Sequence, residues 1–285
     1  MKYIILSKDM KKGKPGDDID TTSGIKEYFE LGWESIGSRF DFIASYNQGL
    51  IDENNTTVVT IEDRMFMYSK FFKNVISYDE FKNIDVKEID IIIDYPESFP
   101  QVTAYYPQLF SDKNDKNKYF RKKEDQDLIF NGFDIDDAIK PESSFVVMCI
   151  RHRDWCKDRN SDLSFWQKLV NGINGAHDIF VVGKNNENFC FENNITYIPK
   201  LRDYVSLIKN KNCKGVILQS TGTAVLALTC SESDIYFVDH AKVSSLHNNV
   251  SPICGSRQIH FFTGGLFPYY DLSDKTVTSI LKGVL

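Results

Sequence analysis

The feature that most constrains the fold is a regular alternation in the second half of the chain. Short apolar runs are followed by segments whose apolar residues recur at helical spacing. Apolar runs of four to eight residues are typical of strands buried on both faces, and strands that alternate with helices form parallel sheets. We therefore expect strands over 144–150, 178–182, 195–198, 215–218 and 234–238, and helices over 162–171, 201–209, 222–229 and 275–281.

The first half shows the same alternation less regularly. Strands are expected over 2–6, 57–61 and 89–94, and helices over 24–32 and 65–72, whereas the signal is weak from residue 102 to 137. The segment Ala138–Ser143 contains Pro141 and has the composition of a linker. The sequence therefore predicts two Rossmann-like α/β domains, residues 1–140 and 141–285, that face each other across a cleft.

Length and composition narrow the class of protein. A chain of 285 residues is too long for one small core. Its first apolar run is too short for a signal peptide, and no run approaches the roughly 20 residues that span a bilayer. We expect a soluble, cytoplasmic protein. The cysteines are scattered without a CxxC pair, and Cys149, His152 and Cys156 lack an evident fourth ligand, so no metal site is predicted.

A basic connection follows the strand predicted at 144–150. Arg151 and Arg153 stand directly after that strand and before a helix. In open parallel sheets, ligands bind outside the carboxyl ends of the strands, and the guanidinium forks of arginine suit phosphate and carboxylate groups. The alternative is that these arginines pair with nearby acids such as Asp154 or Asp158.

A second connection opens on the same edge of the predicted sheet. Ser220, Thr221, Gly222 and Thr223 form the turn between the strand at 215–218 and the next helix. A helix start offers amide donors and the positive end of the helix dipole, although hydroxyl side chains there are often simple caps. Because both connections leave the same edge, together they favour a phosphate site. Gly183 and Lys184 end a third strand at this edge, and Tyr197 lies near the end of a fourth.

Other nucleotide and hydrolase motifs are missing. The sequence contains no GxGxxG after its first strand, no GxxxxGK[ST] and no GxSxG. A dinucleotide dehydrogenase, a P-loop nucleotidase and a nucleophile-elbow hydrolase are therefore unsupported.

Two stretches resemble GT-B glycosyltransferases, most closely the heptosyltransferase-like branch. STGTAVLAL looks like that branch's Asp-Thr-Gly-x-x-His-Leu-Ala turn, with matches at Thr221, Gly222, Leu226 and Ala227. Ser220 stands where the family has Asp, and Val225 where it has His. PGDDIDTTSGI looks like the family's Gly-Asp-x-Ile loop, with matches at Gly16, Asp17 and Ile19.

The resemblance implies a glycosyltransferase that uses a nucleotide-sugar donor, with Asp17 as the base that activates an acceptor hydroxyl. Arginine and a helix start would stabilise the leaving diphosphate, so no cofactor is expected. The alternative GT-A class uses a metal-binding DxD motif, and DID occurs at Asp18–Asp20 and at Asp134–Asp136. The expected donor-binding residues are Arg151, Arg153, Gly183, Lys184, Tyr197, Ser220, Thr221, Gly222 and Thr223.

The acceptor is left open between two classes. The segment Lys113–Glu124 combines basic residues with Tyr119 and Phe120, a pattern found in nucleic-acid sites. A hydroxymethylated base in bacteriophage DNA is therefore one possible acceptor, and a carbohydrate is the other. Asp18, Lys122 and Lys123 are the expected acceptor-binding residues. The alternative functions are a noncatalytic nucleotide-binding protein and a nucleic-acid-binding protein.

Overall fold

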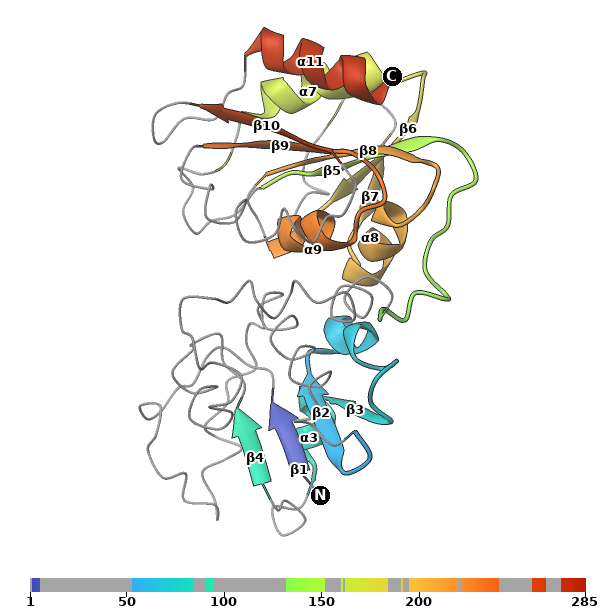
Figure 1. Cartoon of the computed structure of the whole chain (residues 1–285), viewed down its shortest axis with the longest axis vertical. Helices are drawn as coiled ribbons and strands as arrows, with labels where there is room; N and C mark the ends of the chain where they lie inside the picture. The colour runs from blue at the N-terminus through green and yellow to red at the C-terminus, as the bar shows by residue number, and fades with distance from the viewer. Residues whose placement is uncertain are drawn as a thin grey trace. The chain divides into compact units, whose positions relative to one another are not determined.

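The computed structural model describes residues 2–5, 53–84, 91–94, 132–151, 160, 162–183, 191, 195–219, 222–240, 258–264 and 273–285. The chain divides into two compact units, Met1–Asp134 and Ile135–Leu285 (Figure 1). The division falls shortly before the boundary expected after residue 140.

Unit 1 contains a parallel sheet of four described strands in the order β3-β2-β1-β4. The strands expected at 2–6, 57–61 and 89–94 are present, and a further one precedes a short helix that begins with a capping box between Ser77 and Glu80. The elements are β1 (Lys2–Ile5), β2 (Thr56–Thr60), η1 (Glu62–Met67), β3 (Asn74–Ser77), α3 (Tyr78–Lys82) and β4 (Ile91–Asp94).

The helix expected over 65–72 is wrong in type and bounds. The chain forms the 3-10 helix η1 and then turns, with Tyr68 N–H donating to the Met65 carbonyl. Phe66, Met67 and Tyr68 are all buried. Three consecutive buried residues cannot share one face of an α-helix, so the tighter turn serves this segment better.

Unit 2 contains a parallel sheet of six described strands in the order β10-β9-β8-β5-β6-β7. Numbered along this unit, the order is 3-2-1-4-5-6, that of a doubly wound Rossmann fold. Five of the strands match those expected, and β10 was not predicted. The strands are β5 (Phe145–Cys149), β6 (Asp178–Val182), β7 (Thr196–Ile198), β8 (Cys213–Leu218), β9 (Ile235–His240) and β10 (Ile259–Gly264).

Helices cover both faces of this sheet. The four expected helices are present as α7 (Leu163–Ile173), α8 (Leu201–Ile208), α9 (Gly222–Cys230) and α11 (Asp274–Val284). Figure 1 shows α7 and α11 on one face and α8 and α9 on the other. The fully buried Trp166 of α7 packs in a core with Val146, Met148 and Ile217 of the sheet. Burial on both faces explains why each central strand reads as a continuous apolar run.

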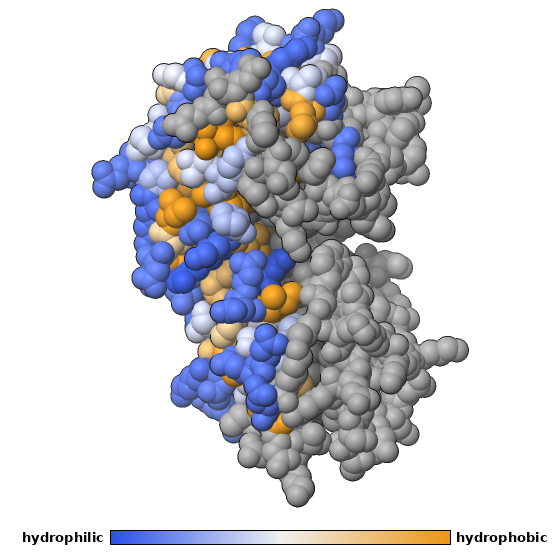
Figure 2. All heavy atoms as spheres, turned by 180° about the vertical axis from the view of Figure 1, so that it is seen from behind, coloured by the Kyte–Doolittle hydropathy of each residue, from blue (hydrophilic) through white to orange (hydrophobic). Residues whose placement is uncertain are grey.

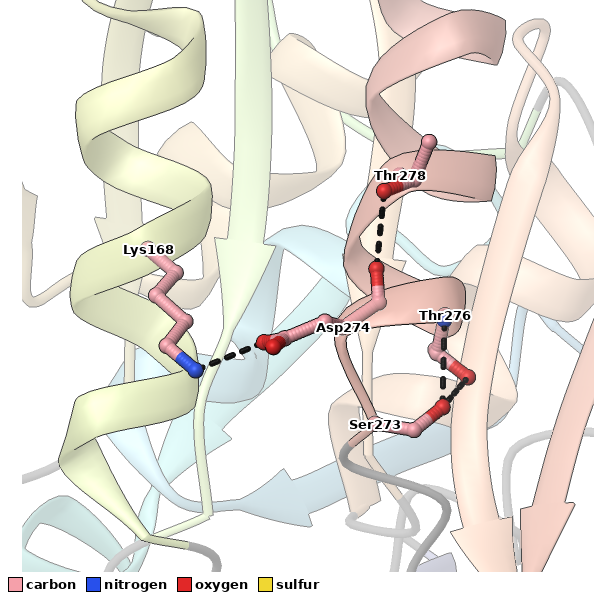
Figure 3. Close-up of polar contacts among 5 residues, drawn as sticks. All are labelled: Lys168, Ser273, Asp274, Thr276 and Thr278. Carbon is pink, nitrogen blue, oxygen red and sulfur yellow. Dashed lines mark hydrogen bonds and ion pairs between the residues drawn. The ribbon is translucent and has the colours of Figure 1, made fainter.

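Polar contacts tie α11 to α7 at the surface (Figure 3). The Ser273 hydroxyl accepts from the Thr276 amide and caps α11, and Lys168 Nζ lies 2.6 Å from Asp274 Oδ1. Both charged side chains are largely exposed, so this pair contributes at most about 1 kcal/mol to stability.

The described surface is mixed in character. Figure 2 shows mostly hydrophilic residues with small separate hydrophobic areas. The exposed large apolar side chains, among those described, are Ile139, Leu163 and Leu285. No helix in the described part of the chain has both the length and the apolar character needed to cross a membrane.

Candidate functional site

The site is built at the switch point of the unit 2 sheet, between β5 and β8. These neighbours pair from Phe145 with Cys213 to Cys149 with Leu218. β5 leads through α7 to β6 on one side, whereas β8 leads through α9 to β9 on the other. The chain therefore reverses its direction across the sheet between β5 and β8, and doubly wound sheets bind ligands outside the carboxyl ends of the strands at such a position.

Arg151 lies at this switch point, two residues beyond the end of β5. It is only 3% exposed. Its main-chain N–H donates to Gln219 Oε1 at 2.9 Å, and its Nη1 donates to Asn160 Oδ1 at 2.6 Å. A bond to a neutral amide fixes the direction of the guanidinium without itself neutralising the charge. The Arg151 guanidinium therefore lies in a fixed orientation at the switch point, where the sequence predicts an anion-binding arginine.

Gln219 is a residue that the sequence analysis missed. It directly follows β8, is fully buried, and its main-chain N–H donates to the Cys149 carbonyl at 3.2 Å. The sequence alone offered no signal for it, because a glutamine after a strand can equally face solvent, and only the structure shows its burial and its partners.

A hydrogen bond from Tyr204 of α8 anchors the start of α9. Its hydroxyl donates to the Thr223 carbonyl at 3.0 Å. Burial raises the pKa of the Cys149 thiol to about 12, although hydrogen bonds with the Tyr204 and Thr223 side chains partly oppose that shift. Burial and the neighbouring Cys149 likewise raise the pKa of Tyr204. Both groups are therefore neutral at pH 7, and Cys149 is a structural thiol rather than a nucleophile.

Two other expected residues end strands at the same edge. Gly183 follows β6 with φ of 141°, a conformation that favours glycine. Tyr197 lies on β7, half-buried against the core. The structure thus brings Arg151, Gly183 and Tyr197 to the carboxyl edge together with the α9 start at Gly222 and Thr223.

The remaining expected residues lie outside the described part of the chain. They are Asp17, Asp18, Lys122, Lys123, Arg153, Lys184, Ser220 and Thr221. Their roles remain predictions. Within the described ranges, no group of three His, Cys, Asp or Glu side chains could hold a metal ion.

Unit 1, taken by itself, contains an arginine with buried donors that the sequence analysis did not single out. Arg64 lies in η1, after the carboxyl end of β2. Its Nε and Nη1 atoms are buried without a hydrogen-bond partner. Leaving buried guanidinium donors unsatisfied is costly, so an anionic group that accepted from them would be bound favourably.

Comparisons with known proteins agree on the fold. No protein-family model and no curated protein matches the sequence. Among solved structures, the Escherichia coli heptosyltransferase WaaC with ADP is 12% identical, covering 99% of this chain and 98% of that chain with a TM-score of 0.51. The Escherichia coli ADP-heptose lps heptosyltransferase II is 10% identical, covering 99% and 96% with a TM-score of 0.54. At these identities the likeness shows the fold alone, and the predicted GT-B fold class is confirmed.

Proposed function

We propose that this chain is a glycosyltransferase that moves a sugar from a nucleotide-sugar donor to an acceptor hydroxyl, with the donor held by unit 2. The observation that carries the proposal is Arg151, buried and oriented at the switch point between β5 and β8. A buried guanidinium beside a helix start is suited to a diphosphate. The likeness in fold to the two heptosyltransferases supports the same conclusion.

The chemistry follows from what glycosyl transfer requires. The bond between sugar and diphosphate breaks, and the leaving diphosphate gains negative charge. Arg151 and the amides that begin α9 would stabilise that charge, so we propose transfer without a metal cofactor. A base must take the proton of the acceptor hydroxyl, and by resemblance we assign that role to Asp17.

For the acceptor we favour a carbohydrate. One similar structure is named an ADP-heptose lps heptosyltransferase. A base in phage DNA is the alternative, and it depends on Lys122 and Lys123. Sugar transfer to a carbohydrate acceptor that is retained in Lys122→Glu/Lys123→Glu would support the carbohydrate. Transfer to hydroxymethylated DNA that is lost in the same variant would support DNA.

Donor binding is tested by the thermal stability of the full chain with ADP, UDP, GDP, CMP or TDP, each with and without EDTA. A nucleotide at 100 times its Kd stabilises by about 2.7 kcal/mol, and we expect one diphosphate to do so regardless of EDTA. Arg151→Met should raise the Kd of that nucleotide by at least about tenfold, since hydrogen bonds to charged groups are worth about 1.5–3 kcal/mol. Arg202→Met is the control, because Arg202, on α8, forms its ion pair with Asp137 in the segment before β5. A chain that binds none of these nucleotides contradicts the proposal.

The base is tested separately. Asp17→Asn should abolish sugar transfer and leave the donor Kd unchanged, because the carboxylate acts on the acceptor. Turnover equal to that of the unaltered enzyme would remove Asp17 from the mechanism while leaving the donor site in place.

A further inference from the structure

The hydrogen bonds of Gln219 depart from those of a regular ladder. In a parallel sheet, a residue that bonds to a neighbouring strand uses both of its main-chain groups. Its N–H donates to the carbonyl of one residue on that strand, and its carbonyl accepts from the N–H of the residue two positions later on the same strand. Gln219 N–H donates to the Cys149 carbonyl, as the pattern requires. The next bond comes from Arg151 N–H, but it goes to the side-chain oxygen Oε1 of Gln219 at 2.9 Å.

The use of a side-chain acceptor in place of the main-chain carbonyl has a geometric consequence. β8 ends at Leu218 and α9 begins at Gly222, so the main chain changes direction within a few residues of Gln219. A side-chain carbonyl that takes the place of the main-chain carbonyl keeps Arg151 N–H satisfied while the chain after Gln219 leaves the sheet. Without it, a fully buried amide donor at Arg151 would lose its acceptor.

We propose that Gln219 is a positioning residue for the donor. Its side chain joins the connection after β5 to the connection after β8 and so fixes the Arg151 guanidinium relative to the start of α9. This inference rests on the proposed function, in which both groups bind one diphosphate. The residue touches no donor atom in this scheme and acts through Arg151.

The side chain required here is specific. Methionine has similar length and burial but accepts poorly, so Gln219→Met removes the bond while preserving most of the packing. In Gln219→Asn the side chain keeps its amide but is shorter by one methylene. Its oxygen would therefore not reach Arg151 N–H without a shift of the main chain.

A matched control separates positioning from stability. Ser206, also buried in unit 2, donates its hydroxyl to the Ile139 carbonyl at 2.7 Å, in the segment that precedes β5. Ser206→Ala therefore removes one part-buried hydrogen bond at the amino-terminal side of β5, away from the carboxyl edge. Both Gln219→Met and Ser206→Ala should lower Tm.

The experiment is calorimetric titration of the full chain with ADP, or with whichever of the five nucleotides stabilises the unaltered chain most. We expect Gln219→Met to raise the nucleotide Kd by about tenfold and Ser206→Ala to change it by less than about twofold. Gln219→Asn, which retains an amide, should raise Kd in the same direction and serves if the methionine variant fails to fold. Hydrogen exchange at the Arg151 amide should be faster in both Gln219 variants.

The outcomes distinguish the two claims. If the unaltered chain binds no nucleotide, the proposed function and this inference both fail. If it binds, but the folded Gln219 variants retain its Kd or lose affinity only as much as Ser206→Ala does, Gln219 is purely structural and the proposed function stands.

Discussion

Stability at alkaline pH should reveal the buried thiols beneath the site. The pKa of Cys149 is raised from 9.0 to about 12 and that of Cys213 to about 11, in both cases chiefly by burial. A raised folded-state pKa means that the folded protein keeps a proton which the unfolded chain releases. The stabilisation is fully present below pH 9 and is lost as the pH rises toward 11 to 12.

The magnitude follows from the two pairs of values. Between pH 7 and pH 10, a thiol that titrates near 9 when unfolded and near 12 when folded lowers the free energy of unfolding by roughly 1 to 2 kcal/mol. The second thiol costs about the same, so together they remove about 3 kcal/mol. The raised pKa of Tyr204 acts in the same direction. This is a large part of the 5–15 kcal/mol typical of a folded domain.

The assay is urea unfolding at pH values from 7 to 10.5, followed by tryptophan fluorescence, in which the fully buried Trp166 reports on unit 2. Other side chains also titrate in this range, so the comparison is with Cys149→Ala/Cys213→Ala. That variant should be less stable at pH 7 because it creates cavities, but its stability should fall less steeply above pH 9. Parallel curves for the two proteins would refute the assignment of the loss to these thiols.

Three further substitutions test local contacts by the same unfolding assay. Tyr204→Phe should cost about 1 kcal/mol, the value of one hydrogen bond, and lower Tm by about 2–4 °C. Gly283→Ala should destabilise by about 1–3 kcal/mol despite better helix propensity, because its Cβ would lie 2.7 Å from Tyr236 Cε1, on a ring that is itself buried. Lys168→Ala should change stability by less than about 1 kcal/mol, since its pair with Asp274 is exposed; a larger loss would mean that the pair orders α11.

The elements of unit 2 could be predicted because their patterns are local and strong. Asp178–Val182 matches its predicted strand residue for residue, since a run buried on both faces leaves little choice of period. β10, Ile259–Gly264, was missed although Gly255-Ser256 and Gly264-Gly265 flank it, because its apolar run is short and contains His260. Its pairing with β9 is also non-local. The helix expected over 65–72 was wrong because the apolar residues of that segment suggest helical spacing, whereas the 3-10 helix η1 begins at Glu62 and ends at Met67.

For the candidate site, the sequence predicts which residues share an edge of the sheet but not where their side chains point. That Arg151 and the α9 turn share an edge follows from topology alone, because parallel strands present their carboxyl ends together. The direction of a side chain at that edge does not follow. At Thr223, the structure shows the main-chain carbonyl accepting from the Tyr204 hydroxyl, a contact that the sequence did not indicate, and the role of the Thr223 hydroxyl toward a donor stays a prediction.

The same ambiguity explains why Gln219 escaped notice. A glutamine after a strand can point to solvent, to a ligand or into the protein, and only the partner across the sheet decides among these. Here that partner is the Arg151 amide, 68 residues earlier in the chain. A hydrogen bond between such distant positions leaves no periodic signal, so the side chains that aim a site can be found only once the strands that carry them are paired.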